Sequence, residues 1–464
     1  MQQLGRIAVL KVYLMSDLNV PASVGRSLFA RALRSSAFTA GSYALTQVMR
    51  LGSNLILTRL LAPDAFGVMA LVSVVLVGMV MFSDVGVSAS IAQNKRGDDP
   101  NFLNTAFTIH AFRGTMLWLV TCGLAWPLAQ FYHAPELVYL LPVAGISLFI
   151  SGFNPTRIDT ATRHLLLGRV TLLDLIAQAI GIVAMVVLSL MSHSVWGLVI
   201  GAIVGSLAKL VLTWAYLPGP SNRFHWDKTA GHELIHFGKW IFLSTACGFA
   251  LAQGDKAIFG HYLSLEELGV YNIGYFLASF PLLLARAVNS RIMIPLYRDH
   301  HPADSAANFA KMRKLRWAIS GATLLLLGFL AVIGMPLVGF MYDERYAAAG
   351  FIVVVVALIQ MPETIGITYD QSALAAGDGR NYFWLQALKA FVQTVAFLVG
   401  ITHGGLEGAL LAQAAALLAL HPAVILLARK HRAWDPLNDV VLFALAAALV
   451  ALALWVNVDM LGVL

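Results

Sequence analysis

Arg59-Leu-Leu-Ala-Pro-Asp-Ala-Phe-Gly67 is a tight turn between two long apolar segments. Residues 38–60 precede it and residues 66–91 follow it, and both are apolar enough to span a bilayer. A membrane-spanning helix needs roughly 20 apolar residues at a rise of about 1.5 Å each, and both segments reach that length. Pro63 and Gly67 are typical of a turn that ends one helix and starts the next. The stretch therefore predicts a helical hairpin that crosses the membrane twice.

The turn has a second copy later in the chain. Tyr262-Leu-Ser-Leu-Glu-Glu-Leu-Gly269 aligns without gaps with Leu60-Leu-Ala-Pro-Asp-Ala-Phe-Gly67. Each copy starts a block of six apolar segments, which is the pattern of an internal duplication.

The alternation of apolar segments and polar loops predicts an all-α, polytopic membrane protein with two six-helix bundles and an extra C-terminal helix. The predicted spans are residues 38–60, 66–91, 102–131, 136–154, 170–192, 195–217, 238–262, 267–294, 316–340, 348–376, 382–402, 405–428 and 439–461. The expected domains are a cytoplasmic basic N-terminal segment (1–35), an N-terminal six-helix bundle (36–217), a cytoplasmic linker (218–237), a C-terminal six-helix bundle (238–428), and a cytoplasmic basic loop with the extra transmembrane helix (429–464).

Composition and charge agree with this topology. Hydrophobic residues make up 59% of the chain and charged residues only 12%, whereas about a quarter of a soluble domain is charged. With the N-terminus in the cytoplasm, most of the 31 Lys and Arg residues fall in inside loops, and only Arg59 and Arg345 fall in outside loops. This bias follows the positive-inside rule and sets the predicted orientation. The net charge of +7 is then a consequence of topology, and no nucleic-acid partner is expected.

An Arg-bearing first helix, the motif R-L-L-x-P-x-x-F-G and a second helix with D-x-G resemble the polysaccharide-exporter branch of the multidrug/oligosaccharidyl-lipid/polysaccharide exporter superfamily, the lipid-linked oligosaccharide flippases. The resemblance implies two bundles around a central cavity in the bacterial inner membrane. It implies that polyprenyl-pyrophosphate-linked repeat units move from the cytoplasmic to the outer leaflet, by alternating access, for surface or exopolysaccharide synthesis. The implied partners are this lipid-linked oligosaccharide and membrane lipids, with a polysaccharide polymerase and glycosyltransferases as further candidates.

Charged residues inside predicted spans are the candidate site residues. Each costs about 2.5–3.5 kcal/mol at mid-helix on insertion scales, so each normally faces a cavity or a partner. Cations that could bind a pyrophosphate are Arg50, Lys256, Arg286, Arg113 and Lys389. Candidates for a gate or for ion coupling are Asp84, Asp174, Asp255 and Glu363.

Arg50 is the leading candidate among them, because the resemblance implies cationic residues on the first helix that face the cavity. Its alternative is a structural pair, for instance with Asp255. Two roles are possible for Arg286: it could be part of a gate, or its guanidinium could bind a phosphate through several N–H donors.

The duplication places opposite charges at matching positions. Asp84 aligns with Arg286, and Asp174 aligns less closely with Lys389. If the halves face each other, such pairs could close the cytoplasmic mouth of a cavity. The alternative is that each charge is satisfied within its own half.

Other classes of function receive less support. A multidrug or small-cation antiporter of the same superfamily is the alternative function, but its cavity should be acidic, and the deep charges here lean basic. No acid–base pair, metal-ligand spacing or nucleotide fingerprint occurs, so we expect neither an enzyme nor a cofactor. The membrane potential, H⁺ or Na⁺ are the open energy sources, with Asp255 and Glu363 as candidate ion carriers.

Overall fold

The computed structural model describes residues 28–458 except residues 85, 165, 239 and 240. All regular elements in this part of the chain are helices, which confirms the all-α prediction. Most of the predicted N-terminal segment 1–35 lies outside the described residues, since the first helix begins at Leu28.

The first half of the chain forms six long helices and three short ones. Their bounds are α2 (Leu28–Leu60), α3 (Pro63–Phe82), α4 (Val87–Gln93), α5 (Pro100–Phe131), α6 (Leu137–Gly152), α7 (Arg157–Arg163), α8 (Leu167–Ser192), α9 (Trp196–Tyr216) and α10 (Lys228–Gly238). Pro63 stands at the first position of α3, where its missing N–H costs no helical hydrogen bond. The predicted hairpin turn between residues 60 and 66 is therefore present.

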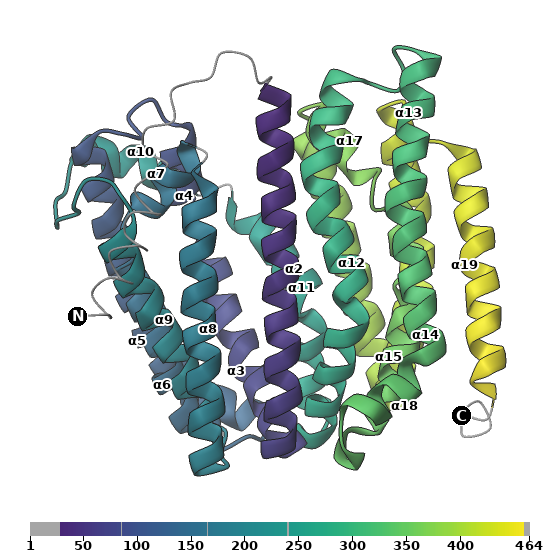
Figure 1. Ribbon diagram of the computed structural model, residues 1–464, viewed down its shortest axis with the longest axis horizontal. Coiled ribbons are helices and arrows are strands. Elements are labelled where there is room, and N and C mark those ends of the chain that lie inside the picture. The colour runs from purple at the N-terminus through teal and green to yellow at the C-terminus, as the bar shows by residue number, and fades with distance from the viewer. Residues whose placement is uncertain (1–27, 85, 165, 239–240, 459–464) are drawn as a thin grey trace, which may run out of the picture.

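The second half is built from longer and more broken helices. Their bounds are α11 (Ile241–Tyr262), α12 (Leu265–Asp299), α13 (Ala306–Arg316), the π-helix η2 (Trp317–Gly321), α14 (Ala322–Met341), the 3₁₀ turn η3 (Glu344–Tyr346), α15 (Ala348–Ile359), α16 (Met361–Gly366), α17 (Asp370–Ala375), α18 (Gly379–Lys430) and α19 (Pro436–Val456). Figure 1 shows the long helices side by side, with α2 between a group around α8 and a group around α12 and α14.

Helix α18 folds back on itself. Gly404 and Gly405 have non-helical dihedral angles, and Gly405 has φ +58°. In a straight helix, Gly400 and Gly408 would lie about 12 Å apart along the axis. Instead a Cβ atom added to Gly400 would be 2.4 Å from the Gly408 carbonyl oxygen. The two arms therefore pack against each other, as the predicted spans 382–402 and 405–428 require.

Length and composition support a polytopic membrane protein. Within the described residues, 8 helices are long and apolar enough to cross a membrane, or 9 if α6 and α7, bent by 59°, form one span. The set includes α19, the predicted extra C-terminal helix. Helices α2, α5 and α11 have 33, 32 and 22 residues but are not in this set.

The two copies of the repeated turn meet at the seam between the halves. A Cβ atom on Gly67 would lie 1.9 Å from the Leu265 carbonyl oxygen, and one on Gly269 would lie 1.9 Å from the Pro63 carbonyl oxygen. Pro63 and Leu265 occupy matching positions in the sequence alignment. The contact is thus reciprocal, which is the pattern of a two-fold interface.

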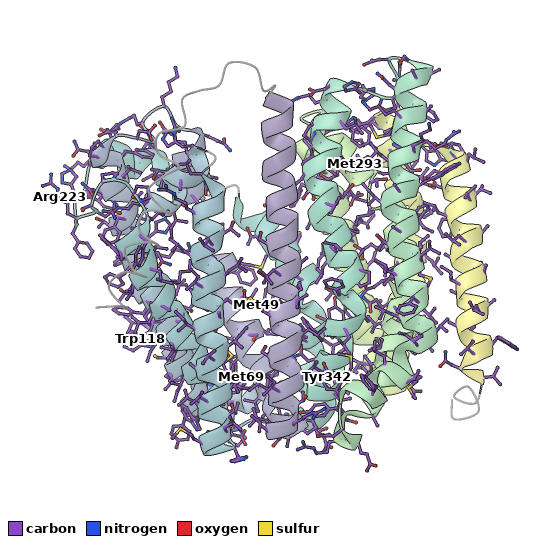
Figure 2. All side chains as sticks on the ribbon, in the orientation of Figure 1. Met49, Met69, Trp118, Arg223, Met293 and Tyr342 are labelled. Atoms are coloured by element: carbon purple, nitrogen blue, oxygen red, sulfur yellow. The ribbon has the colours of Figure 1, made fainter. Side chains whose placement is uncertain are left out.

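Further contacts close the same end of the molecule. Arg345 donates a hydrogen bond to the Thr58 carbonyl at 3.0 Å, and the Tyr346 hydroxyl donates to the Leu61 carbonyl at 3.1 Å. Both bonds join η3 of the second half to the first half, at the end of α2 and at the turn that follows it. Tyr342 and Met69 mark this lower end in Figure 2.

The opposite end carries the short helices. Helices α4, α7, α10, α13 and α17 lie there, at the top of Figure 1. The predicted linker 218–237 is folded onto α5, because the backbone N–H groups of His225 and Asp227 donate to the hydroxyls of Thr108 and Thr105, each at 3.0 Å. Loops predicted to be cytoplasmic therefore gather at one end, and loops predicted to be outside gather at the other.

Helix α19 is fixed to the second half by buried polar contacts near its start. Asp435 is fully buried and accepts two hydrogen bonds from Arg313, at 2.6 and 2.9 Å. The Tyr369 hydroxyl donates to Asp439 at 2.7 Å. The predicted extra helix is thus an integral part of the C-terminal half.

Candidate functional site

A cavity of about 320 Å³ lies within the C-terminal half. It is lined mainly by α12, the segment from α15 to α17, and both arms of α18. The predicted span 348–376 is broken here, because α15 ends at Ile359 and Pro362, the second residue of the next helix α16, has no backbone N–H to give. Breaks of this kind free polar groups in membrane proteins, and such groups are tolerated where they face a cavity.

Two ion pairs stand at the cavity wall. Arg286 on α12 pairs with Glu363 on α16. Lys389 on α18 donates to Asp370 on α17 at 2.6 Å, and both of these side chains are only 15% and 14% exposed. The structure thus brings together three of the predicted site residues, Arg286, Lys389 and Glu363. With Asp370 included, the four charges at the cavity balance.

Two further predicted cations lie against aromatic rings of α12. The Arg50 guanidinium carbon is 5.4 Å from the centre of the Phe276 ring, and the Lys256 Nζ atom is 5.4 Å from the centre of the Tyr275 ring. Met49, the residue before Arg50, is on the middle part of α2 in Figure 2. Because Tyr275 itself lines the cavity, Lys256 is one side chain away from it.

Asp255 has a different environment. Its side chain is buried and accepts a hydrogen bond from the Tyr271 hydroxyl at 2.8 Å. Asp255 lies on α11 and Tyr271 on α12, so this bond joins neighbouring helices of the C-terminal half.

The remaining predicted residues lie in the N-terminal half. Arg113 donates to the Ser83 hydroxyl at 2.9 Å and to the Val80 carbonyl at 2.8 Å. Asp84 accepts from the Gly86 backbone N–H at 2.9 Å. Both residues therefore stabilise the end of α3, at the break before α4.

The predicted gate pairs are not formed in this structure. The described residues contain no ion pair between Asp84 and Arg286, since Arg286 is paired with Glu363. Asp174 pairs with Lys209 at 2.9 Å, and Lys389 pairs with Asp370. In each case the charge is satisfied within its own half, which was the alternative interpretation.

Ionic contacts also organise the end of the N-terminal half that is predicted to be cytoplasmic. Asp98 accepts from Arg163 at 3.0 Å and lies 2.8 Å from the His164 ring. His164, and to a lesser degree Arg163, lower the pKa of Asp98 below its usual value of 3.8. Arg96 bonds Asp99 at 2.9 Å and Asp227 at 3.0 Å, which ties this loop to the segment before α10.

Sequence reasoning missed a buried arginine. Arg316 is the first residue of the predicted span 316–340 and was not among the candidate site residues, but its side chain is fully buried and donates to the Tyr297 hydroxyl at 2.7 Å. Its guanidinium also lies 4.7 Å from the centre of the Tyr369 ring. The only signal in the sequence was the position of Arg316 at the end of a basic run, directly before an apolar segment.

Comparisons with known proteins agree with this architecture. A family profile described as "Polysaccharide biosynthesis protein" matches residues 56–350. The chain is 22% identical over 359 residues to the succinoglycan biosynthesis transport protein ExoT of Rhizobium meliloti (strain 1021), covering 77% of this chain and 72% of that protein. It is 20% identical over 326 residues to the teichuronic acid biosynthesis protein TuaB of Bacillus subtilis (strain 168), covering 70% and 67%.

Solved structures show the same fold at low identity. The lipid II flippase MurJ in an inward closed conformation has a TM-score of 0.67 at 9% identity, covering 92% of this chain and 99% of that one. An inward-facing multidrug resistance MATE family transporter of the MOP superfamily has a TM-score of 0.63 at 13% identity, covering 93% and 98%. The fold is therefore that of a MOP superfamily transporter.

Proposed function

The chain belongs to the polysaccharide biosynthesis protein family, and from this premise we propose that it is a flippase for polyprenyl-pyrophosphate-linked oligosaccharide repeat units. The proposed direction is from the cytoplasmic to the outer leaflet of the bacterial inner membrane, with the N-terminus in the cytoplasm. One observation carries the proposal: a cavity with polar and charged walls lies inside an apolar helical bundle. A sugar pyrophosphate cannot cross hydrocarbon alone, because burying its polar groups without partners costs too much free energy.

The ion pairs supply chemistry for binding a phosphate. A pyrophosphate can replace the carboxylate partner of Arg286 or Lys389, because both anions accept hydrogen bonds from the same cations. Arg286 is 48% exposed, so it can be reached from the cavity. The proposed cationic path is completed by Lys256, which lies against the lining residue Tyr275, and by Arg50, which lies against Phe276 of α12, whereas Arg113 lies in the N-terminal half.

Transport by alternating access requires the seam to open. The Gly67–Leu265 and Gly269–Pro63 contacts close the end that we assign to the outside. In the proposed cycle these contacts part, and the cytoplasmic end then closes. Asp84 and Asp174 stay candidates for that second closure.

The membrane potential is sufficient as an energy source. Moving two negative charges outward gains roughly 4–5 kcal/mol at 100 mV, since each charge is worth about 2.3 kcal/mol. Coupling to H⁺ or Na⁺ is the alternative, with Asp255 and Glu363 as the proposed carriers.

The test is the fate of the lipid-linked intermediate in cells that lack this protein. We expect lipid-linked repeat units to accumulate on the cytoplasmic face and to clear after complementation with the wild type. Arg50→Ala and Arg286→Gln are expected to clear them at least tenfold more slowly, because each loses a charged donor worth roughly 1.5–3 kcal/mol. Lys311→Met, which removes an exposed cation on α13 outside the cavity, is the control and should complement fully.

Two results would contradict this proposal, one in whole and one in part. If the intermediate does not accumulate and the cells become sensitive to cationic drugs, the antiporter replaces the flippase. If Arg50→Ala complements like the wild type, the proposed flippase function is retained, but Arg50 is not part of the binding site.

A further inference from the structure

Side-chain amides dominate the polar lining of the C-terminal cavity. They come from α12, from the break between α15 and α16, from α17 and from both arms of α18. The amide residues that line it are Asn289, Gln360, Gln371, Gln386, Gln393 and Gln413. Amides from so many elements converge here because the broken span and the folded α18 surround a single space.

Three of these amides are only partly satisfied by the protein. Gln360 donates to the Ser279 hydroxyl at 2.9 Å, and Asn289 donates to the Ile367 carbonyl at 2.8 Å. Their side-chain oxygens, and that of Gln371, are buried without a hydrogen-bond partner in the protein. Gln360 is 4% exposed and Asn289 is 1% exposed.

Turning an amide over does not remove this imbalance. Each amide carries one oxygen acceptor and one NH₂ donor, so a turned Gln360 would leave its donor unpaired instead. An unpaired polar group in a buried place is costly, and a bound ligand with matching groups relieves that cost.

The chemistry of the free groups selects the ligand. As the amides are oriented here, these groups are acceptor oxygens, which repel a phosphate, whereas the cations Arg286 and Lys389 at the wall attract one. A metal is not indicated either, since the described residues contain no group of three or more His, Cys, Asp or Glu that could hold one. The free acceptors instead match a neutral ligand with several O–H donors.

The shape of the cavity agrees with such a ligand. Tyr275 and Tyr382 add aromatic surface to the lining, onto which the apolar C–H face of a sugar ring can pack. The volume of about 320 Å³ is at the low end of the roughly 300–1,000 Å³ of small-ligand pockets. It therefore suits one part of a head group and not a whole lipid-linked unit.

We propose that this amide cluster is a saccharide subsite, distinct from the cations that take the pyrophosphate. The inference rests on the proposed flippase function and divides its substrate between two sets of residues. Gln360, Gln371 and Asn289 hold sugar hydroxyls, while Arg286 and Arg50 hold the phosphates. The sugar at the reducing end, next to the pyrophosphate, is the part that reaches the amides first.

The test compares lipids with and without a sugar. The purified full-length protein in detergent is titrated with bare polyprenyl pyrophosphate and with the same lipid carrying one glucose, galactose or N-acetylglucosamine. For the wild type, we expect at least one sugar to lower the Kd about tenfold, or about 1.4 kcal/mol. Gln360→Leu and Gln371→Leu should abolish that gain and leave the Kd for the bare lipid unchanged.

Controls separate the subsite from general damage. Gln130→Leu changes an exposed glutamine on α5, outside the cavity, and should keep the full sugar-dependent gain. Arg286→Gln should weaken the binding of all four lipids alike. If Gln360→Leu does not fold, Gln371→Leu and Gln386→Leu carry the test, because both positions are only half-buried.

Each outcome decides a different question. Equal wild-type affinity for all four lipids, or a gain that survives in the glutamine variants, overturns the saccharide subsite and leaves the flippase standing. Binding of none of the four lipids overturns the proposed function, and this inference with it.

Discussion

The two halves of the molecule carry matching turn motifs but place their charged pairs differently. In the N-terminal half, Asp174 and Lys209 are 41% and 37% exposed, and other pairs lie in the loops at the end predicted to be cytoplasmic. In the C-terminal half, Asp370 and Lys389 are 14% and 15% exposed, at the wall of a cavity. Both halves contribute equivalent contacts to the seam, whereas the cavity is lined mainly by residues of the second half. The less exposed of the two pairs thus lies at the cavity, in the half to which we assign most of the proposed binding residues.

The largest expected effect comes from removing one partner of each pair. Lys389→Met leaves the Asp370 carboxylate buried and unpaired, so we expect the free energy of unfolding to fall by about 3–5 kcal/mol. Lys209→Met breaks a half-exposed pair and should cost only about 0–1 kcal/mol. Thermal unfolding of the two variants in detergent measures the contrast. Equal losses would show that the halves do not differ in the way described.

The seam offers a medium effect that should be the same in both halves. Gly67→Ala and Gly269→Ala each push a Cβ atom into a backbone carbonyl, and we expect each to cost about 1–3 kcal/mol. Gly339→Ala on α14 is the control, because its Cβ meets open space and a helical Ala is favoured by roughly 0.5–1 kcal/mol. A clear inequality between the two seam variants in thermal unfolding would contradict the reciprocal contact.

The smallest effect is expected from the exposed ion pairs at the end predicted to be cytoplasmic. His164 and Arg163 lower the pKa of Asp98 in the folded state. The ionised carboxylate of Asp98 therefore stabilises the folded protein at pH values above its usual pKa of 3.8. This stabilisation is lost as the pH falls through the lower pKa of the folded state. Wild type should therefore exceed Asp98→Asn in unfolding temperature at pH 5, and the gap should close toward pH 3. A gap that widens on acidification would refute this sign.

The sequence was a good guide to the helices and a poor guide to their partners. Apolar length and the motif at Pro63 predicted the hairpin, and the pair Gly404–Gly405 coincides with the predicted boundary between two spans. These features are local, since propensity and hydropathy act over one turn or one span. The extra helix α19 was predicted for the same reason.

Partners of the deep charges depend on which way each helix faces, and hydropathy along one chain does not contain that information. Arg286 and Glu363 are 77 residues apart, and no spacing rule connects them. The alignment of Asp84 with Arg286 suggested a pair, but symmetry-related positions need not touch. Glutamines such as Gln360 gave no signal at all, because isolated amides occur in many membrane helices and only the fold brings these together.

The attachment of α19 has a practical consequence for measuring motion. Because Arg313 and Tyr369 hold the start of α19 to the rest of the second half, α19 must travel with that half as one body. A fluorescent dye on α19 and another on α9, on the opposite side of the molecule in Figure 1, would therefore measure the distance between the two halves. The distance between the dyes would report the opening and closing of the transporter in real time, without a label in the cavity.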